Sequence, residues 1–347
     1  MMNLTQQEKM AIPTAPEIPG LVFRHFNDES DYPILVALLS GCNAADGLER
    51  ADTLEGVAHN YSHLEHCDLS QDFVLAEVAG TPVAYQRVWW EQEKDGPWLG
   101  MMVAKVLPEW RRKGLGSALL RWGEDRLSQV AARLRSEGSL LLETPCRYSL
   151  EVYHTEKARI ALLEKNGYAV ARSEHVMVRP DLEAIPDAPM PPGLEARPAV
   201  PEHYRRVWEA AVEAFQDHWG FIPPTENGFE NFISEPFNDP SLWQVGWDGD
   251  QVAGSVLAFI NNDENQALNR LRGYSEGISV RRPWRRRGLA RALLVRSLQE
   301  FKRRGMQEAA LSVDTQNWHS AYKLYESVGF RIVTGYSYFQ KSLQPGV

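Results

Sequence analysis

The sequence predicts two consecutive domains of the mixed α/β (α+β) class, and three observations support this prediction. The chain has 347 residues, more than one hydrophobic core usually supports. One order of strands, a basic turn and helices occurs twice, at a spacing of about 170 residues that indicates duplication of a whole domain. A proline-rich stretch at 179–193 separates the copies and is typical of a linker. We expect a first domain at 1–180, a linker at 181–193 and a second domain at 194–347.

Composition argues against several classes of protein. The formal net charge is −9, which disfavours general binding to nucleic acid or to anionic membranes. No apolar run reaches the roughly 18 residues of a membrane helix, and the first ten residues lack the apolar core of a signal peptide. Cys42, Cys67 and Cys146 are odd in number and widely spaced, which fits a reducing compartment. We therefore expect a cytoplasmic protein.

The same elements surround the basic turn in each half. Each copy is preceded by two strands joined at a tight turn, which falls at Gly80 in 73–88 and at Asp248-Gly249 in 242–260. Each copy is followed by an apolar strand, at 139–144 and 309–313, and by a short helix that ends in a glycine-aromatic pair, at 162–168 and 324–330.

The basic turn itself is the strongest repeat. Residues 106–120 read VLPEWRRKGLGSALL and residues 280–294 read VRRPWRRRGLARALL. Strand character ends at Val280, and from Gly288 to Gly305 the apolar positions follow the spacing of a helix. The glycine is therefore expected at a junction of strand and helix, where the first turn of the helix begins.

A helix N-terminus in this setting suits a phosphate. Its first N–H groups have no partner within the helix, and they carry a partial positive charge. Glycine at 288 and alanine at 290 allow an anion to approach the backbone, and the arginines at 285–287 and 291 add bidentate donors. The fingerprints of P-loop and dinucleotide enzymes are both missing.

The pattern R-x-x-G-x-G/A after a strand, together with NWHSAYKLYESVGF at 317–330, resembles the GNAT acyltransferase superfamily. The resemblance covers nearly the entire chain, as two consecutive domains. It implies a mixed, mostly antiparallel sheet that is splayed near its middle and holds acetyl-CoA in the gap. The cofactor contacts implied for the second half come from Ile278, Ser279, Val280, Arg285, Arg286, Arg287, Gly288, Leu289, Ala290, Arg291, Asn317 and Ala321. The matching turn of the first half adds Arg111, Gly114 and Gly116.

The resemblance also implies the proton-transfer groups. Tyr325 matches the family's general acid, which protonates the departing thiolate, and such a transfer is typically worth about 10²–10⁴-fold in rate. A base must take a proton from an ammonium acceptor, and Glu276 is the candidate. The family's frequent glutamate position falls nearer Tyr274, which shares one strand face with Glu276.

The two halves differ in these groups. The first half has Leu163 where the second has Tyr325, Thr155 for Asn317 and Arg159 for Ala321. Tyr148 and Tyr153 precede this helix and remain alternative donors. We expect a catalytic C-terminal domain and a catalytically degenerate N-terminal domain, an asymmetry that resembles mycothiol synthase-like members of the superfamily.

The acceptor is expected to be a primary amine of a small molecule. Acceptor recognition in this superfamily usually involves the first helices of the domain, which end here at AFQDHWGFIPP. The residues expected to contact the acceptor are Asp217, His218, Trp219, Phe221 and Tyr274. The acceptor itself and the oligomeric state stay open.

Two alternatives to an enzyme remain, a CoA-binding regulatory or scaffold protein and, with less support, a nucleic-acid-associated protein. The WRRRG run is not continued by a basic stripe with interleaved aromatic residues, so we expect no nucleic-acid partner and no membrane partner. His59, His63, His66 and Cys67 have a spacing that could hold zinc, but no second ligand cluster accompanies them, and we expect no metal.

Overall fold

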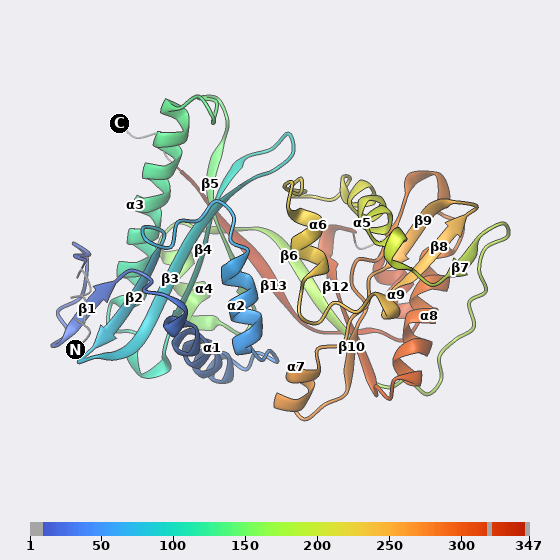
Figure 1. The fold of residues 1–347 in the computed structure, drawn as a ribbon. Coiled ribbons are helices and arrows are strands. Elements are labelled where there is room, and N and C mark those ends of the chain that lie inside the picture. Colours follow the sequence, from blue (N-terminus) through green and yellow to red (C-terminus); the bar gives the residue numbers. More distant parts are fainter. Residues whose placement is uncertain (1–9, 318–320, 344–347) are drawn as a thin grey trace, which may run out of the picture. The chain divides into compact units, whose positions relative to one another are not determined.

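The computed structural model describes residues 10–317 and 321–343. The described chain forms two compact units, shown in Figure 1. Unit 1 contains the residues up to Ala171 together with those from Ser337 onward, and unit 2 contains Arg172–Tyr336. Both units combine sheets with helices, which confirms the mixed α/β class. No helix within the described ranges is both long enough and apolar enough to cross a membrane.

Unit 1 is built on a sheet with the strand order β1-β2-β3-β4-β5. The pairs are antiparallel except for β4 and β5, which are parallel. Its strands and helices are β1 (Leu21–Arg24), α1 (Tyr32–Asp46), α2 (Leu54–Ser62), β2 (Phe73–Val78), β3 (Thr81–Gln92), β4 (Trp98–Val106), α3 (Leu115–Ser136), β5 (Cys146–Tyr153) and α4 (Lys157–Lys165). Short 3-10 turns, η1 (Glu29–Asp31) and η2 (Pro108–Trp110), precede α1 and α3.

The two faces of this sheet have separate cores because side chains alternate along each strand. On β3, Tyr85 packs with Leu35 and Leu38 of α1, while Val88 packs with Leu127 of α3. The predicted turn at Gly80 is confirmed, since β2 and β3 form a hairpin in which this glycine has φ 81°.

Unit 2 contains two groups of strands, ordered β6-β12-β10 and β11-β9-β8-β7. Its strands and helices are β7 (Glu195–Arg197), α5 (Pro201–Phe215), α6 (Gly228–Ile233), β8 (Gln244–Asp248), β9 (Gln251–Val256), α7 (Asn262–Ala267), β10 (Arg272–Tyr274), β11 (Ser279–Val280), α8 (Leu289–Arg303), β12 (Glu308–Asp314) and α9 (Lys323–Ser327). Short 3-10 turns lie at η3 (Pro240–Leu242), η4 (Arg282–Trp284) and η5 (Thr315–Asn317). The predicted turn after Asp248 is confirmed by the β8–β9 hairpin.

Two strands run from one unit into the other along the chain. Strand β6 (Ala169–Arg179) follows α4, and from Arg172 onward it belongs to unit 2, where it pairs antiparallel with β12. Strand β13 (Arg331–Ser342) follows α9, and from Ser337 onward it belongs to unit 1. There Gln340 accepts a hydrogen bond from Arg147 of β5, and Ser337 bonds His154. Unit 2 therefore contains most of β6, which follows the last helix of unit 1 along the chain. Unit 1 contains the second half of β13, which follows the last helix of unit 2.

The predicted strand at 139–144 is wrong. This segment has no strand in the structure, and Leu141 and Leu142 are 62% and 80% exposed. The strand lies just beyond it, at β5, where apolar residues alternate with Arg147, Ser149 and Glu151 in CRYSLEVY. A short apolar run without alternation does not distinguish a buried strand from a loop. The matching prediction at 309–313 is confirmed by β12.

Candidate functional site

Both basic turns have the same backbone conformation. The glycine before each helix is left-handed, with φ 94° at Gly114 and 89° at Gly288. Two residues earlier, Arg112 and Arg286 are also left-handed, at φ 62° and 65°. A non-glycine residue rarely adopts this region, and alternation with ordinary backbone turns successive N–H groups toward one point. Each turn thus forms an anion-binding backbone at the start of α3 and of α8.

The first arginine of each turn is engaged within the protein. Arg111 donates from Nε to the Val106 carbonyl at 2.9 Å and from both Nη atoms to Asp46, at 2.6 and 2.9 Å. Arg285 repeats this arrangement, with Nε 2.9 Å from the Val280 carbonyl oxygen and Nη1 2.8 Å from Asp217. These guanidinium groups hold the turn to the preceding strand and to the end of the first helix.

Asp217 therefore lies at the turn, where it also accepts from Arg282. The hydrogen bonds from Arg282 and Arg285 hold the pKa of this carboxyl well below its usual range. Of the other cofactor residues expected in unit 2, Arg286, Arg287 and Gly288 are exposed, and Leu289 is buried in the core. Ala290 is half-buried, and Arg291 donates to the Asp187 carbonyl at 2.9 Å.

The sheet of unit 1 opens next to its turn, as the predicted splay requires. The parallel pairing of β4 with β5 ends at Met101 and Ser149, so Met102–Val106 separates from β5. A cavity of about 360 Å³ occupies this region, with Val106 and Leu150 on its two sides. Arg111, Gly114 and Gly116 line it, as expected for a cofactor site in the first half.

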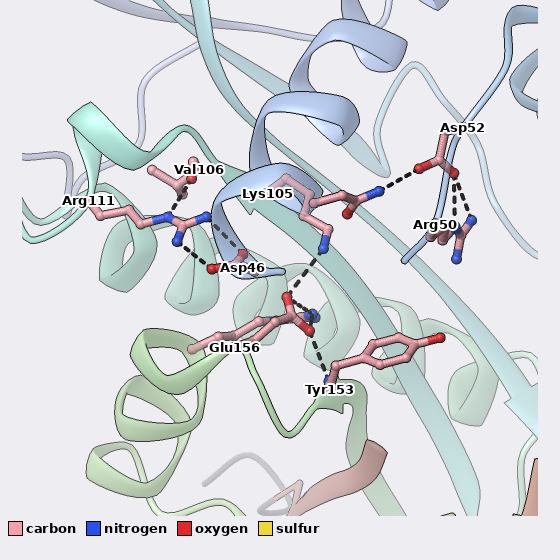
Figure 2. Close-up of polar contacts among 10 residues, drawn as sticks. Asp46, Arg50, Asp52, Lys105, Val106, Arg111, Tyr153 and Glu156 are labelled. Atoms are coloured by element: carbon pink, nitrogen blue, oxygen red, sulfur yellow. Dashed lines mark hydrogen bonds and ion pairs between the residues drawn. The ribbon is translucent and has the colours of Figure 1, made fainter. Parts of the chain in front are cut away.

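The charges around this cavity are mainly positive. Five cationic side chains and two carboxylates line it: Lys105, Arg111, Arg112, Arg159 and Lys165, with Asp46 and Glu156. Figure 2 shows Lys105 and Glu156 pointing toward each other, and Arg111 against Asp46. The excess of cations and the backbone of the turn fit a ligand with several phosphate charges.

Glu156 is the buried centre of this group, at 3% exposure. It accepts from Lys105 at 3.2 Å, from Arg159 at 3.3 Å and from the Tyr153 backbone N–H at 2.9 Å. Burial opposes its ionisation, but the charges of Arg159 and Lys105 hold the pKa of Glu156 below its ordinary value. Sequence reasoning noted Arg159 but missed Lys105 and Glu156, because their pairing spans 51 residues.

In unit 1, the positions that correspond to Tyr325 and Glu276 of unit 2 carry apolar side chains. Leu163 lines the cavity and is buried, and Met102, which aligns with Glu276, is buried beside Gln86. The alternative donors do not line the cavity. Tyr148 bonds Ser128 and the Glu124 carbonyl on α3, and the Tyr153 ring extends away from Glu156 in Figure 2.

Glu276 of unit 2 lies between β10 and β11 rather than on a strand, and its backbone carbonyl accepts from the Leu257 N–H at 2.8 Å. The hydroxyl of Ser275, the residue before it, lies 3.1 Å from that of Ser297 on α8. The backbone N–H of Ser312 donates to Glu276, and burial, followed by the charge of Glu174, raises the pKa of Glu276 to about 8. A carboxyl group with this pKa is suited to take up a proton near neutral pH.

Tyr325 of α9 lies within electrostatic range of Glu276. Its side chain is 7% exposed, and burial and then the charge of Glu276 raise its pKa. Within the described parts of the chain its hydroxyl has no hydrogen-bond partner. The structure thus places the two expected proton-transfer residues within electrostatic range of each other.

The remaining residues that were expected to contact the cofactor lie on β11, against the core of unit 2 and at the end of η5. Ser279 bonds Ser255 of β9 at 3.1 Å, and the carbonyl of Val280 accepts from Arg285. Ile278 and Ala321 are partly buried against the core of unit 2. Asn317 ends η5, and its side chain lies outside the description, as do residues 318–320, including His319.

The expected acceptor residues separate into three places. Asp217 belongs to the turn, whereas His218 lies within electrostatic range of Asp314, and Trp219 lies under the Arg172 guanidinium at 5.3 Å. Tyr274 stacks on Phe259 at 4.9 Å, and its hydroxyl bonds Glu264 and Arg270. Phe221 is half-buried just beyond this loop.

The histidine cluster in unit 1 has other contacts. The rings of His59 and His63 are tilted against each other with centroids 4.2 Å apart, and His66 stacks on Trp90 at 3.6 Å. Among the residues that the structure describes, no group of three or more His, Cys, Asp or Glu side chains is placed to hold a metal ion.

Comparison with protein families identifies both units. Residues 204–330 match the acetyltransferase (GNAT) family, and residues 70–170 match an acetyltransferase (GNAT) domain. The first match contains the turn at Arg285 together with Glu276 and Tyr325, and the second contains the turn at Arg111.

Individual proteins are similar over most of the chain. A mycothiol acetyltransferase of Kineococcus radiotolerans is 32% identical over 65% of this chain and 67% of its own. A mycothiol acetyltransferase of Thermobifida fusca is 25% identical over 86% of this chain and 90% of its own. The crystal structure of a GCN5-related N-acetyltransferase from Sphaerobacter thermophilus aligns with a TM-score of 0.71, at 27% identity, and covers 96% of this chain and 98% of that one.

Proposed function

Since the chain belongs to the GNAT acetyltransferase family and carries two consecutive GNAT domains, we propose that it transfers acetyl from acetyl-CoA directly to a primary amine of a small molecule, with the chemistry confined to unit 2. The observation that carries this proposal is that Tyr325, whose ring is buried in the core of unit 2 and whose hydroxyl makes no hydrogen bond to a described residue, lies within electrostatic range of Glu276.

The residues of unit 2 fit the cofactor. The left-handed backbone at Arg286 and Gly288 would hold the pyrophosphate, and the strand at Ile278–Val280 would face the pantetheine arm. Arg285 would act indirectly, by fixing the turn through Asp217 and the Val280 carbonyl. Acetyl-CoA, when bound, supplies the acetyl group as a thioester.

The two side chains divide the proton transfers between them. Glu276 takes a proton from the acceptor's ammonium group, and its raised pKa makes it a stronger base than an ordinary carboxylate. The Tyr325 hydroxyl provides a proton to the thiolate that leaves. Tyr325 packs in the core that contains α8, whereas Glu276 follows Ser275, whose hydroxyl contacts Ser297 of α8. We therefore expect the acceptor to approach Glu276 from the side opposite α8.

The proposal is tested by an acetyl-CoA-dependent screen of amino sugars, polyamines, amino acids and peptide N-termini. We expect at least one amine to be acetylated by the wild-type chain, and much less by Glu276→Gln and Tyr325→Phe. Turnover that persists unchanged in both variants would refute the assignment. A chain that binds CoA but acetylates none of these amines would favour the regulatory alternative.

Unit 1 supports a second, non-catalytic role. We propose that its cavity binds CoA without turnover, because the phosphate-binding turn is retained while Met102 and Leu163 replace the base and the acid. Calorimetry on the full chain is expected to detect one binding event in each unit. A single event, abolished by disrupting the α8 turn, would exclude this role.

A further inference from the structure

The cavity of unit 1 is lined by a buried side-chain amide, that of Gln86 on β3. The side chain is 1% exposed, and its Nε2 donates to the sulfur of Met102, a weak acceptor, at 3.6 Å. Its Oε1 is buried and accepts no hydrogen bond from any described residue. A polar atom that is buried to this degree normally has a partner. This wall of the cavity therefore offers an acceptor to a ligand that brings an N–H group.

The amide lies between the sheet and α3. Gln86 is directly opposite Ala104 of β4, which also lines the cavity, and directly opposite residues share a face of the sheet. A Cβ on Gly123 of α3 would overlap Nε2 of Gln86 where it stands, so the glycine leaves room for the amide. Glycine inside a helix lowers the stability of that helix. Unit 1 thus accommodates this amide at a cost to α3.

The amide is well separated from the phosphate-binding turn. Gly123 is nine residues beyond Gly114, and at the rise of a helix the two are about 13 Å apart along α3. Leu120 of α3 and Leu150 of β5 line the cavity along this distance, so its wall is largely apolar. A ligand whose phosphates are held at the turn reaches Gln86 only through an arm of about this length. That arm must carry a hydrogen-bond donor.

Unit 2 differs from unit 1 at both positions. The β8–β9 hairpin repeats the β2–β3 hairpin, including its register shift, so that Gln86 corresponds to Val256. Val256 is apolar and fully buried in the core of unit 2. Ser297 of α8 stands at the position that matches Gly123, and its hydroxyl contacts that of Ser275. The unpartnered amide and the glycine beside it are therefore features of unit 1 and not of the fold.

We propose that Gln86 is a ligand-binding residue of unit 1, whose Oε1 accepts a hydrogen bond from an amide N–H of the pantetheine arm of CoA. This inference rests on the proposed binding of CoA in unit 1, and it adds that the unit recognises the arm as well as the phosphates. The arm is an extended chain that contains secondary amides, so it brings N–H donors into an apolar cavity at a distance from the pyrophosphate. The turn at Gly114 holds the charged end, and Gln86 recognises the arm.

The test measures binding to the full chain by calorimetry in a Gly288→Val background, which disrupts the left-handed glycine of the α8 turn and leaves the event of unit 1. The two ligands are CoA and its phosphorylated ADP portion, which keeps the pyrophosphate and has no arm. We expect Gln86→Leu to raise the Kd of CoA about tenfold and to leave that of the nucleotide portion unchanged. Gln92→Leu on the same strand is the matched control, because its amide donates to the Gly96 carbonyl outside the cavity lining. It should change neither Kd.

Thermal unfolding separates this role from a structural one. Ligand-free Gln86→Leu should have a Tm no lower than its parent, since the variant removes a buried polar atom without a partner. Gln86→Met, which keeps an unbranched side chain of similar size, should raise the Kd of CoA to the same degree and serves if leucine disturbs folding. With Gly288 intact, the same loss should appear in one of the two CoA binding events.

The outcomes distinguish this inference from the binding role of unit 1. An unchanged Kd of CoA in Gln86→Leu and Gln86→Met, or an equal loss for CoA and for its nucleotide portion, would overturn the inference and leave CoA binding by unit 1 standing. A folded Gly288→Val chain that binds neither ligand would refute CoA binding by unit 1, and the inference with it.

Discussion

Arg285 and Asp217 form an ion pair, with Nη1 2.8 Å from Oδ2, and Arg111 and Asp46 form its counterpart in unit 1. In both cases the aspartate lies more than 60 residues before the arginine, at or just beyond the end of the first helix of its half. The arginine also binds the last carbonyl of the preceding strand. The duplicated motif has thus kept an internal clamp on the turn in both units.

Loss of this clamp should weaken cofactor binding. In Asp217→Asn we expect the acetyl-CoA KM to rise about two- to fivefold, the range that an exposed ion pair supports, with kcat nearly unchanged. Steady-state kinetics at saturating amine measures both constants. Asp46→Asn removes the matching contact in unit 1 and should leave acetyl transfer as it is. A fall in kcat at constant KM would contradict the clamp.

Tyr325→Phe removes the hydroxyl and keeps the ring in the core. We expect kcat to fall by about 10²–10⁴-fold, the usual contribution of a general acid, while calorimetric binding of acetyl-CoA is retained. Tyr322→Phe on the same helical segment is the control, because that hydroxyl donates to the exposed Glu326 carboxylate, 3.3 Å from it. Equal rates for the two variants would remove Tyr325 from the mechanism.

Activity should depend on pH through Glu276. The base acts when it is deprotonated, so kcat/KM is expected to rise with pH through a midpoint of about 8. Glu276→Gln should lose this rise along with most of the rate. The measurement is kcat/KM between pH 6 and pH 9.5, in roughly half-unit steps, with the free amine concentration corrected for the acceptor's own pKa. A flat wild-type profile would argue for another proton acceptor.

Glu276 should also make the stability of the fold depend on pH, with stability falling as activity rises. Its pKa is raised on folding, so the unfolded chain loses this proton at lower pH than the folded chain does. The neutral form contributes stability below the unfolded value, and this is lost as pH rises toward about 8. Glu276→Gln stays neutral, so its Tm should exceed that of wild type at pH 9 and differ less at pH 5. Thermal unfolding at both values checks this sign.

Filling the cavity of unit 1 with a larger side chain tests whether that cavity binds CoA without turnover. A Cβ on Gly116 would lie 3.2 Å from Leu162 Cδ2, so Gly116→Val places methyl groups where the cavity meets α3. We expect this variant to lose the CoA binding event of unit 1 and to keep acetyl transfer. Gly56→Ala, on α2 and outside the cavity lining, is a control for unrelated change at a glycine of this unit. Loss of turnover in Gly116→Val would contradict a non-catalytic role.

Local signals allowed much of this architecture to be predicted. The turn at Gly288 was predictable because strand, glycine and helix follow one another within a few residues, and the second copy at Gly114 repeats them. The family pattern predicts Tyr325 as the acid and offers Glu276 as a candidate base, and both roles stay predictions. Asp217 was expected in an acceptor pocket, since nothing in its own neighbourhood shows that Arg285, 68 residues later, reaches it.

Other features depend on pairings that sequence spacing does not reveal. Glu174 stands in a strand that reads as the end of the first half, and only the register of β6 on β12 brings it beside Ser312. Lys105 and Glu156 likewise meet only once β4 and α4 flank the cavity. The segment 139–144 was wrongly predicted as a strand because its three consecutive leucines suggested a buried segment. The alternation of apolar and polar residues in β5 is the better indicator of a strand.

The exchange of β6 and β13 has a practical consequence for dissecting this enzyme. Cutting the gene at the proline-rich linker would give a first fragment without Ser337–Ser342, and a second fragment without Arg172–Arg179. Each fragment would expose the edge of an incomplete sheet, which is a template for aggregation. The roles of the two units are therefore best separated by point substitutions in the intact chain rather than by truncation.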